Sequence, residues 1–317
     1  MSAVLTFSEN ERVALELLTP AAALAAALQG RVVAAAVGTA PVGDLDHHGA
    51  AEVLHLKGSG LESFTAERFA EALAAACADV KPRVVLLGAT RDGRDLAGRL
   101  AARLKAGAVS EAQKIEVLPG GEIGAERTFL SGNAVQVVRS RAATVVITVP
   151  PRAHAAPARA GAASPVRELP VTPASRVPEV VEVTEKSKGG IRIEDAPFII
   201  SAGRGFKKKE DLALIEDLAK ALGAEVGCSR PLATDLAWMT EDHWVGLSGH
   251  KVRPKVYVTL GISGQIQHIA GIRDSETIIS VNSDANAPIF KACDIGVVAD
   301  LYKFIPALKA VAAKHQR

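Results

Sequence analysis

The sequence predicts an α/β protein of two domains, each built on a mostly parallel sheet covered by helices. Three observations carry this prediction. Apolar runs of strand length alternate with longer helical patterns in both halves of the chain, and strands joined by crossover helices form parallel sheets. The chain has 317 residues, enough for two domains of ordinary size. A polar stretch that ends in two glycines, residues 185–190, has the composition of a hinge between them.

The first domain is expected over residues 1–188. One helix is predicted to begin at Thr19 and Pro20, as cap and first residue, and to end near residue 28 before Gly30. The other predicted helices are 66–78 and 94–105, and the predicted strands are 3–7, 32–37, 52–56, 84–88, 134–138 and 144–149. Because proline cannot continue a helix or donate to a sheet ladder, the proline-rich stretch 150–178 is expected to be an extended surface loop. Residues 179–183 then resemble a last strand.

The second domain, residues 189–317, repeats the same alternation. The predicted strands are 198–201, 255–260, 277–281 and 295–298, and the predicted helices are 210–222, a short one ending at residue 271, and 302–314. Gly223 is expected to end the first of these helices. Several of the strands end in glycine, serine, asparagine or aspartate. The carboxyl ends of parallel strands are where open α/β sheets bind their ligands, so we expect the binding site there.

Composition narrows the class of protein. Hydrophobic residues make up 48% of the chain and charged residues 23%, which excludes extensive disorder. A formal net charge of +2 does not indicate a basic surface that would bind nucleic acid or an anionic membrane. The three cysteines lie far apart, so a disulfide scaffold or a cysteine metal site is not expected. No signal peptide or membrane-spanning run is apparent, and we expect a cytoplasmic protein that is not embedded in a membrane.

Two glycine-rich turns are the first candidate site residues. Arg204 lies between two glycines in S-A-G-R-G, 201–205, where the backbone can approach an anion and the guanidinium can pair with it. A plain tight turn explains the same residues equally well. The second turn, Gly261-Ile-Ser263-Gly264, leads from a strand into a helix whose first amides are free to bind an anion.

The helix after the second turn carries Gln267 and His268 one turn in, within reach of the same ligand edge. The alternative is a serine helix cap with an incidental Gln-His pair. Two further strands end in Asn282 and Asp300. Asp300 could hold the ribose or adenine of a nucleotide, or it could simply cap a helix.

The segment C-S-R-P places Ser229 and Arg230 before Trp238, and a second stretch, Trp244 to Lys251, follows with V-G-L-S-G, including Ser248 and Gly249. An arginine stacked over an aromatic ring would offer both charge and a planar face. Surface packing is the alternative reading of the tryptophans. No serine-histidine-acid order, zinc signature or Walker motif stands out, so no catalytic residue and no metal site is predicted.

Taken in order, S-A-G-R-G, C-S-R-P, V-G-L-S-G, L-G-I-S-G-Q-I-Q-H-I-A-G and V-N-S-D-A-N-A-P-I-F-K-A-C-D-I-G-V-V-A-D-L resemble the α subunit of electron transfer flavoproteins. The resemblance covers residues 198–306. The first half is similar to that family in length and in its strand–helix rhythm. The spacing from Ser229 and Arg230 to D-L-A-W, 235–238, resembles the Fix-type branch of the family more than the mitochondrial one.

The resemblance implies a heterodimer in which the Rossmann-like C-terminal domain of this subunit holds most of one FAD and a β subunit completes the site. AMP or a second FAD would lie on that β subunit. Carried over by position, the cofactor-binding residues are Arg204, Ser229 and Ser263 at the pyrophosphate, Asn282 and Asp300 at the adenosine, and Arg230, Ser248, Gln267 and His268 around the ring. Gly249, Gly261 and Gly264 are also expected to bind the cofactor. Leu247 stands where the family usually has glutamine, which removes an amide.

The resemblance also implies a function. The chain would be an electron carrier rather than an enzyme with substrate chemistry of its own, since the flavin performs the redox step. The donor would be an acyl-CoA or other dehydrogenase, and the acceptor a quinone oxidoreductase or FixC-like, ferredoxin-linked protein. Arg230 and His268 would favour negative charge on the ring and raise its first reduction potential. The alternatives are an adenine-nucleotide-binding module without redox function, a Fix-type bifurcating subunit that uses NADH, and an assembly subunit that has lost its cofactor.

Overall fold

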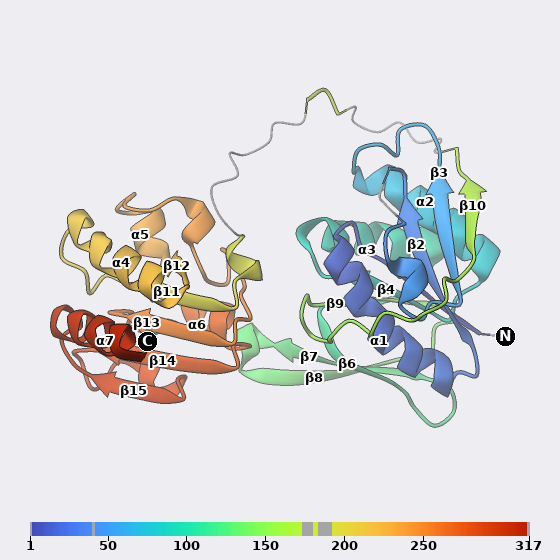
Figure 1. Cartoon of the computed structure of the whole chain (residues 1–317). Coiled ribbons are helices and arrows are strands. Elements are labelled where there is room, and N and C mark those ends of the chain that lie inside the picture. Colours follow the sequence, from blue (N-terminus) through green and yellow to red (C-terminus); the bar gives the residue numbers. More distant parts are fainter. Residues whose placement is uncertain (1, 40–41, 173–179, 183–191, 316–317) are drawn as a thin grey trace. The chain divides into compact units, whose positions relative to one another are not determined.

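The structure is a computed structural model that describes residues 2–39, 42–172, 180–182 and 192–315. The chain divides into two compact units, Met1–Val183 and Thr184–Arg317 (Figure 1). Both units are α/β folds whose main sheet is parallel and covered by helices, as the sequence predicts. The predicted hinge at 185–190 lies outside the described residues, and the boundary at residue 188 stays a prediction.

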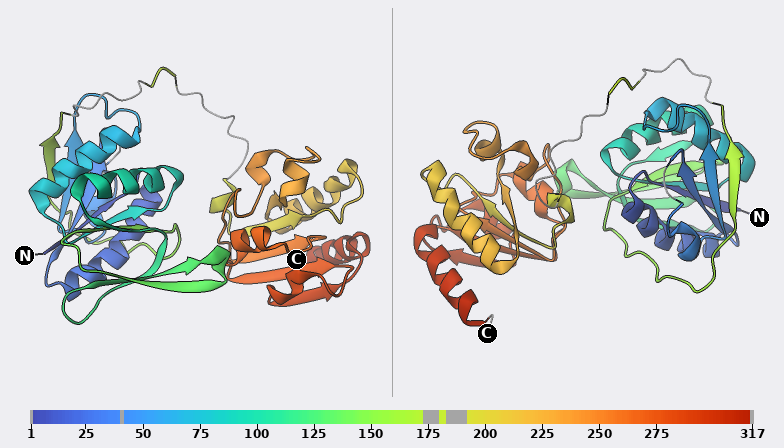
Figure 2. Two further views of the ribbon diagram at one scale, coloured as in Figure 1. Left: turned by 180° about the vertical axis from the view of Figure 1, so that it is seen from behind. Right: turned by 45° about the horizontal axis from the view of Figure 1, so that its top comes forward.

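The first unit is built on a seven-stranded sheet in the order β10-β3-β2-β1-β4-β9-β5, in which every neighbouring pair is parallel. The strands are β1 Ala3–Phe7, β2 Arg31–Val37, β3 Glu52–Lys57, β4 Val84–Gly88, β5 Gly107–Val109, β9 Val145–Val149 and β10 Val166–Pro170. Helices α2 (Ala66–Val80) and α3 (Arg91–Leu104) cover one face, and α1 (Glu11–Ala27) covers the other (Figure 2). Burial on both faces explains the nearly continuous apolar runs of the central strands.

The first helix differs from the prediction. It begins at Glu11, where the Asn10 side chain accepts a hydrogen bond from the backbone of Val13, and Pro20 lies inside it rather than at its first position. Apolar side chains before and after the proline form one buried stripe against the sheet, namely Val13, Leu17, Leu18, Ala21 and Leu24. Packing of this stripe outweighs the backbone hydrogen bond that proline removes.

The predicted strand 134–138 does not join the parallel sheet. It belongs to β8 (Ala134–Ser140), which pairs antiparallel with β7 (Ile123–Phe129), and β7 pairs antiparallel with β6 (Ala112–Val117). The turn between β6 and β7 contains Gly120 and Gly121, both with positive φ. Strands β6 and β7 were not predicted, because half-exposed strands with charged residues among the apolar ones lack a long apolar run.

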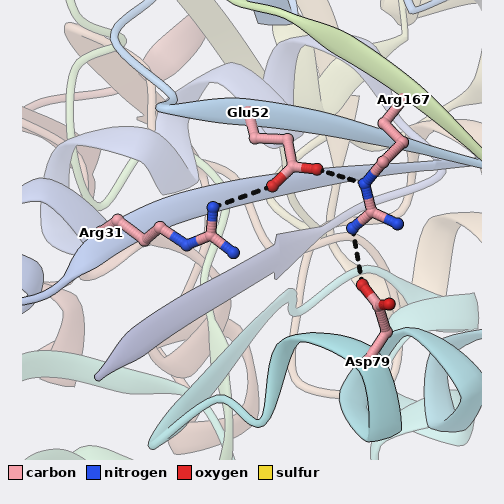
Figure 3. Close-up of polar contacts among 4 residues, drawn as sticks. All are labelled: Arg31, Glu52, Asp79 and Arg167. Carbon is pink, nitrogen blue, oxygen red and sulfur yellow. Dashed lines mark hydrogen bonds and ion pairs between the residues drawn. The ribbon is translucent and has the colours of Figure 1, made fainter. Parts of the chain in front are cut away.

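The proline-rich stretch is not wholly a loop. Five of its residues form β10, an edge strand beside β3, and the polar network of Figure 3 fastens it. Glu52, which is buried, accepts hydrogen bonds from Arg31 (3.0 Å) and Arg167 (2.6 Å), and Arg167 also donates to Asp79 (2.6 Å). An edge strand needs hydrogen bonds on one side only, so it tolerates a proline-rich neighbourhood. The last strand predicted at 179–183 is absent from its described residues 180–182, which form no strand.

The second unit is a five-stranded parallel sheet in the order β12-β11-β13-β14-β15. The strands are β11 Phe198–Ala202, β12 Glu225–Cys228, β13 Val256–Leu260, β14 Thr277–Asn282 and β15 Ile295–Val298, and the helices are α4 Leu212–Leu222, α5 Arg230–Ala233, α6 Ile266–Ile272 and α7 Leu301–His315. Helices α4 and α7 pack on one face, and α6 lies over the other. The short strand β12 and helix α5 were not predicted. Gly223 ends α4 in the left-handed conformation, as predicted.

Three absences follow from the parts of the chain that the structure describes. No helix there has the length and apolar character needed to cross a bilayer. No cluster of His, Cys, Asp and Glu side chains there could hold a metal ion. The three cysteines, Cys77, Cys228 and Cys293, are free, and burial raises the pKa of Cys77 and of Cys228 to about 12.

Candidate functional site

The strand order of the second unit places a binding site between two particular strands. The order in which strands are added reverses between β11, the first strand, and β13, the third, because β12 lies on one side of β11 and the later strands lie on the other. In doubly wound sheets, ligands bind outside the carboxyl ends of the strands at such a switch point. The two glycine-rich turns singled out in the sequence, 203–205 and 261–264, follow these two strands.

The two turns are in backbone contact. Gly203 donates to the Leu260 carbonyl at 2.9 Å, and Gly205 donates to the Gly261 carbonyl at 3.0 Å. A Cβ atom on Gly203 would lie 2.3 Å from the Gly261 oxygen, and one on Gly205 would lie 2.7 Å from the Gly261 Cα. Both distances are too short for any side chain. The close approach of the turns therefore requires glycine, and it leaves a floor of bare backbone at the switch point.

The turn at 261–264 is held from two sides. The Asn282 amide donates to the Ile262 carbonyl at 2.9 Å, and the backbone of Ile289 donates to the Ser263 carbonyl at 3.1 Å. Gly264 has a φ of +86°, and a Cβ on it would lie 2.3 Å from the Ile289 nitrogen. Ser263 is exposed and does not cap α6, which begins after Gln265. Because α6 has only seven residues, its first amides matter more at this edge than a helix dipole.

Two arginines bring positive charge to the same edge. Arg204 follows β11 and Arg230 follows β12, and both are exposed. Among the described residues neither guanidinium has a carboxylate partner. Arg230 lies over the ring of Trp244, 5.7 Å from its centroid, so the stacked arginine that we predicted exists with Trp244. Both tryptophans also pack against the core of this unit. Unpaired guanidinium groups beside bare backbone suit an anionic ligand.

The loop between α5 and β13 lies against α6. The Leu247 amide donates to the Gln267 carbonyl at 2.7 Å, and Gly246 packs so closely on Gly271 that a Cβ on Gly271 would lie 2.6 Å from the Gly246 Cα. Ser248 is exposed beside this contact. Gly249 lacks room for a side chain, since a Cβ there would lie 2.5 Å from the Trp244 carbonyl oxygen. The structure thus brings V-G-L-S-G and the start of α6 together, although they are far apart in the sequence.

His268 is placed differently from the other candidates. Its ring is buried, with Nδ1 3.0 Å from the Val245 carbonyl oxygen and Nε2 3.3 Å from the Tyr257 hydroxyl. Burial lowers the pKa of His268 to about 4, so the imidazole is neutral at physiological pH. The expected positive charge of His268 is therefore not supported, and Arg204 and Arg230 supply the exposed positive charge at this edge.

The remaining predicted residues have structural contacts. Asn282 holds the 261–264 turn, and its Oδ1 also accepts from the Asp284 backbone at 3.0 Å. Asp300 accepts from the Tyr302 backbone at 2.7 Å and so caps α7, which is the alternative the sequence left open. Ser229 is buried at the carboxyl end of β12, beside the β11 turn. A role of these residues toward adenosine or pyrophosphate stays a prediction.

The donor set fits a nucleotide. Bare backbone at the switch point, two unpaired guanidinium groups and the exposed hydroxyls of Ser248 and Ser263 suit phosphates and a ring with polar edges. One contributor, Tyr257, was not predicted. Tyr257 is fully buried in β13, and only the rarity of aromatic residues in the chain could have drawn attention to it.

Comparison with known proteins decides what this site belongs to. A family model described as "Electron transfer flavoprotein FAD-binding domain" matches residues 192–273, and one described as "Electron transfer flavoprotein domain" matches residues 4–174. The chain belongs to the electron transfer flavoprotein family. The predicted family and its cofactor, FAD, are thus confirmed. The match of 4–174 also shows that the first half belongs to the family, beyond the likeness in length and rhythm noted above.

Three relatives show which branch the chain is similar to. The electron transfer flavoprotein subunit alpha of Thermoanaerobacterium thermosaccharolyticum is 36% identical over 84% of this chain and 81% of its own. Protein FixB of Clostridium saccharobutylicum is 34% identical over 96% and 92%. The lactate dehydrogenase (NAD(+),ferredoxin) subunit LctC of Acetobacterium woodii is 35% identical over 93% and 72%. The chain is an α subunit of this family, similar to both its plain and its Fix-type members.

Proposed function

We propose that this chain pairs with a β subunit and carries electrons through one FAD that its second unit holds. FAD, when bound, supplies one- and two-electron chemistry that no side chain of the protein can perform. The observation that supports this proposal most directly is the pair of glycine turns at the switch point, with two unpaired arginines beside them. The protein's part is to bind the cofactor, orient it and set the electrostatic field around it.

Different residues would contact different parts of the cofactor. Arg204, Ser229 and Ser263, with the bare backbone of Gly261 and Gly264, would hold the pyrophosphate. Asn282 and Asp300 would lie on the adenosine side, and Arg230, Ser248, Gly249 and Gln267 would surround the ring, with His268 directly behind them. Because Arg230 is positively charged and exposed, it would favour negative charge on the ring and raise the first of its two one-electron potentials.

The test is to produce the chain with the β subunit encoded beside it and to titrate the complex. We expect a yellow complex with one FAD for this chain. Arg230→Gln should keep its FAD while the first potential falls by roughly 40 mV, the equivalent of about 1 kcal/mol for a partly solvated charge. Lys220→Gln removes a charge from the exposed side of α4 and should leave the potential unchanged. A colourless complex that binds AMP would refute the carrier and support the nucleotide-binding module.

The partners follow from the same family. The donor is proposed to be a dehydrogenase, of acyl-CoA or another substrate, and the acceptor a quinone oxidoreductase or FixC-like protein, all in the cytoplasm or at its membrane. The similarity to a subunit of an NAD(+)- and ferredoxin-linked lactate dehydrogenase favours a second candidate, a bifurcating complex. A second FAD on the β subunit, counted by flavin release from the complex, would distinguish bifurcation from simple carriage.

A further inference from the structure

Tyr257 is the largest fully buried side chain among the residues that the structure describes. It lies on β13 and faces the side of the sheet that α6 covers. Its hydroxyl is 3.3 Å from His268 Nε2, and the two ring centroids are 6.0 Å apart. Burial raises the pKa of Tyr257 above its ordinary value, although the Ser201 hydroxyl on neighbouring β11 lowers it in part. The phenol is therefore a permanent O–H donor in the protein interior.

The contacts of His268 determine its tautomer. The Val245 carbonyl oxygen, 3.0 Å from Nδ1, can only accept, so Nδ1 must carry the hydrogen. In a neutral imidazole, Nε2 then has a lone pair and accepts from Tyr257. The influences on the pKa of His268 are burial, which lowers it, and the Val245 carbonyl, which raises it.

These contacts join three elements. Tyr257 belongs to β13, His268 to α6, and Val245 to the 244–250 loop that carries Ser248. The same loop is bonded to α6 by the Leu247 amide and the Gln267 carbonyl. The buried imidazole therefore links the loop to the helix, and the tyrosine holds the imidazole in place. We call this chain of contacts, Val245–His268–Tyr257, the bracket.

We propose that Tyr257 is a positioning residue, which acts through His268 to hold the 244–250 loop against α6 and so fixes Ser248 relative to Gln267. The benefit to a flavin rests on the proposed function. The bracket itself does not, because it is made only of this chain's residues. On this assignment His268 shapes the site of the flavin ring as a neutral spacer, and a charge on its imidazole does not contribute to the field at the ring.

Thr259 provides a matched control. It lies two residues further along β13 on the same face, it is fully buried, and its hydroxyl has no hydrogen-bond partner in the described residues. Thr259→Val and Tyr257→Phe each remove one buried hydroxyl from the same strand face. Only the second should disturb His268.

The experiment uses the complex with the β subunit, labelled with ¹⁵N, at oxidised flavin. Imidazole spectra should show His268 neutral with Nδ1 protonated between about pH 6 and 8, where a histidine of ordinary pKa would titrate, and loss of the signals in His268→Gln identifies them. In Tyr257→Phe the Nε2 signal should shift, and hydrogen exchange of the Leu247 amide should rise about tenfold, the factor one hydrogen bond supplies. Thr259→Val should change neither.

The proposal is overturned if His268 is protonated at pH 7, or if Tyr257→Phe behaves like Thr259→Val in both measurements. The readouts do not depend on electron transfer. A complex without flavin would refute the proposed function, and the tautomer and the amide exchange would still test the bracket in it.

Discussion

Replacing Gly264 with alanine tests whether the turn at the switch point depends on glycine. At a φ of +86° an alanine adopts the left-handed conformation, which costs an L-residue about 1–2 kcal/mol. Its Cβ would also lie 2.3 Å from the Ile289 nitrogen and 2.5 Å from the Ile289 Cα. Since both neighbours are backbone atoms, relief requires the turn or the segment at Ile289 to move, and overpacking of this kind costs about 1–3 kcal/mol more.

Gly223→Ala is the control for the cost of the left-handed backbone conformation alone. Gly223 ends α4 with a φ of +67°, and a Cβ on it would meet nothing within 4 Å. It should therefore cost only the conformational part, about 1–2 kcal/mol. The two tryptophans both lie in the second unit, so tryptophan fluorescence during urea unfolding reports on that unit.

We expect the free energy of unfolding to fall by about 2–5 kcal/mol in Gly264→Ala, and by visibly less in Gly223→Ala. FAD content should fall in the first variant only, because the displaced turn carries Ser263 and precedes Gln267. Equal losses of stability in the two variants would show that the contact with Ile289 adds no cost in unfolding free energy. An unchanged FAD content in Gly264→Ala would refute the placement of the cofactor at this turn.

Two further predictions concern charged pairs. His250 donates to Glu194 at 2.5 Å, which raises the pKa of His250; burial alone would raise the pKa of Glu194, but His250 holds it lower. The pair should stabilise the fold most between pH 4.5 and pH 6.5, the ordinary pKa values of a glutamate and a histidine, and less above the raised pKa of His250. The difference in unfolding free energy between wild type and His250→Gln should therefore shrink as pH rises. A difference that does not change with pH would contradict this. Glu52→Gln should cost about 1–2 kcal/mol in urea unfolding and speed hydrogen exchange in β10, since Arg31 and Arg167 lose a buried partner but remain half-exposed. Glu168→Gln, which breaks an exposed pair between β10 and Lys57 of β3, is its control, and equal effects of the two would refute the role of the network.

The central parallel strands could be predicted because each is buried on both faces. Such strands read as short runs of Val, Leu, Ile and Ala, and the crossover helices between them have helical spacing. The antiparallel strands β6 and β7 could not, because their pattern mixes apolar and charged residues. Strand β10 could not either, since ion pairs from other elements hold it in place.

The glycine turns and the arginines of the candidate site were within reach of the sequence. Gly203, Gly205 and Gly264 follow strands directly, and the motif order is specific to the family. The state of His268 was not. Its spacing from Gly264 suggested a side chain directed at the ligand edge, while its contacts with Val245 and Tyr257 come from a loop and a strand that are distant in sequence.

What the amino-acid order alone determined, therefore, is the alternation of strands and helices, the turns that need glycine, and membership of the family. Those depend on local periodicity and on backbone angles that few residues tolerate. The tertiary structure decided that Arg230 stacks on Trp244 rather than Trp238, that Asp300 caps a helix, and that His268 is buried between Val245 and Tyr257. Partner choice, burial and pKa depend on which distant segments pack together, and no short stretch of sequence carries that information.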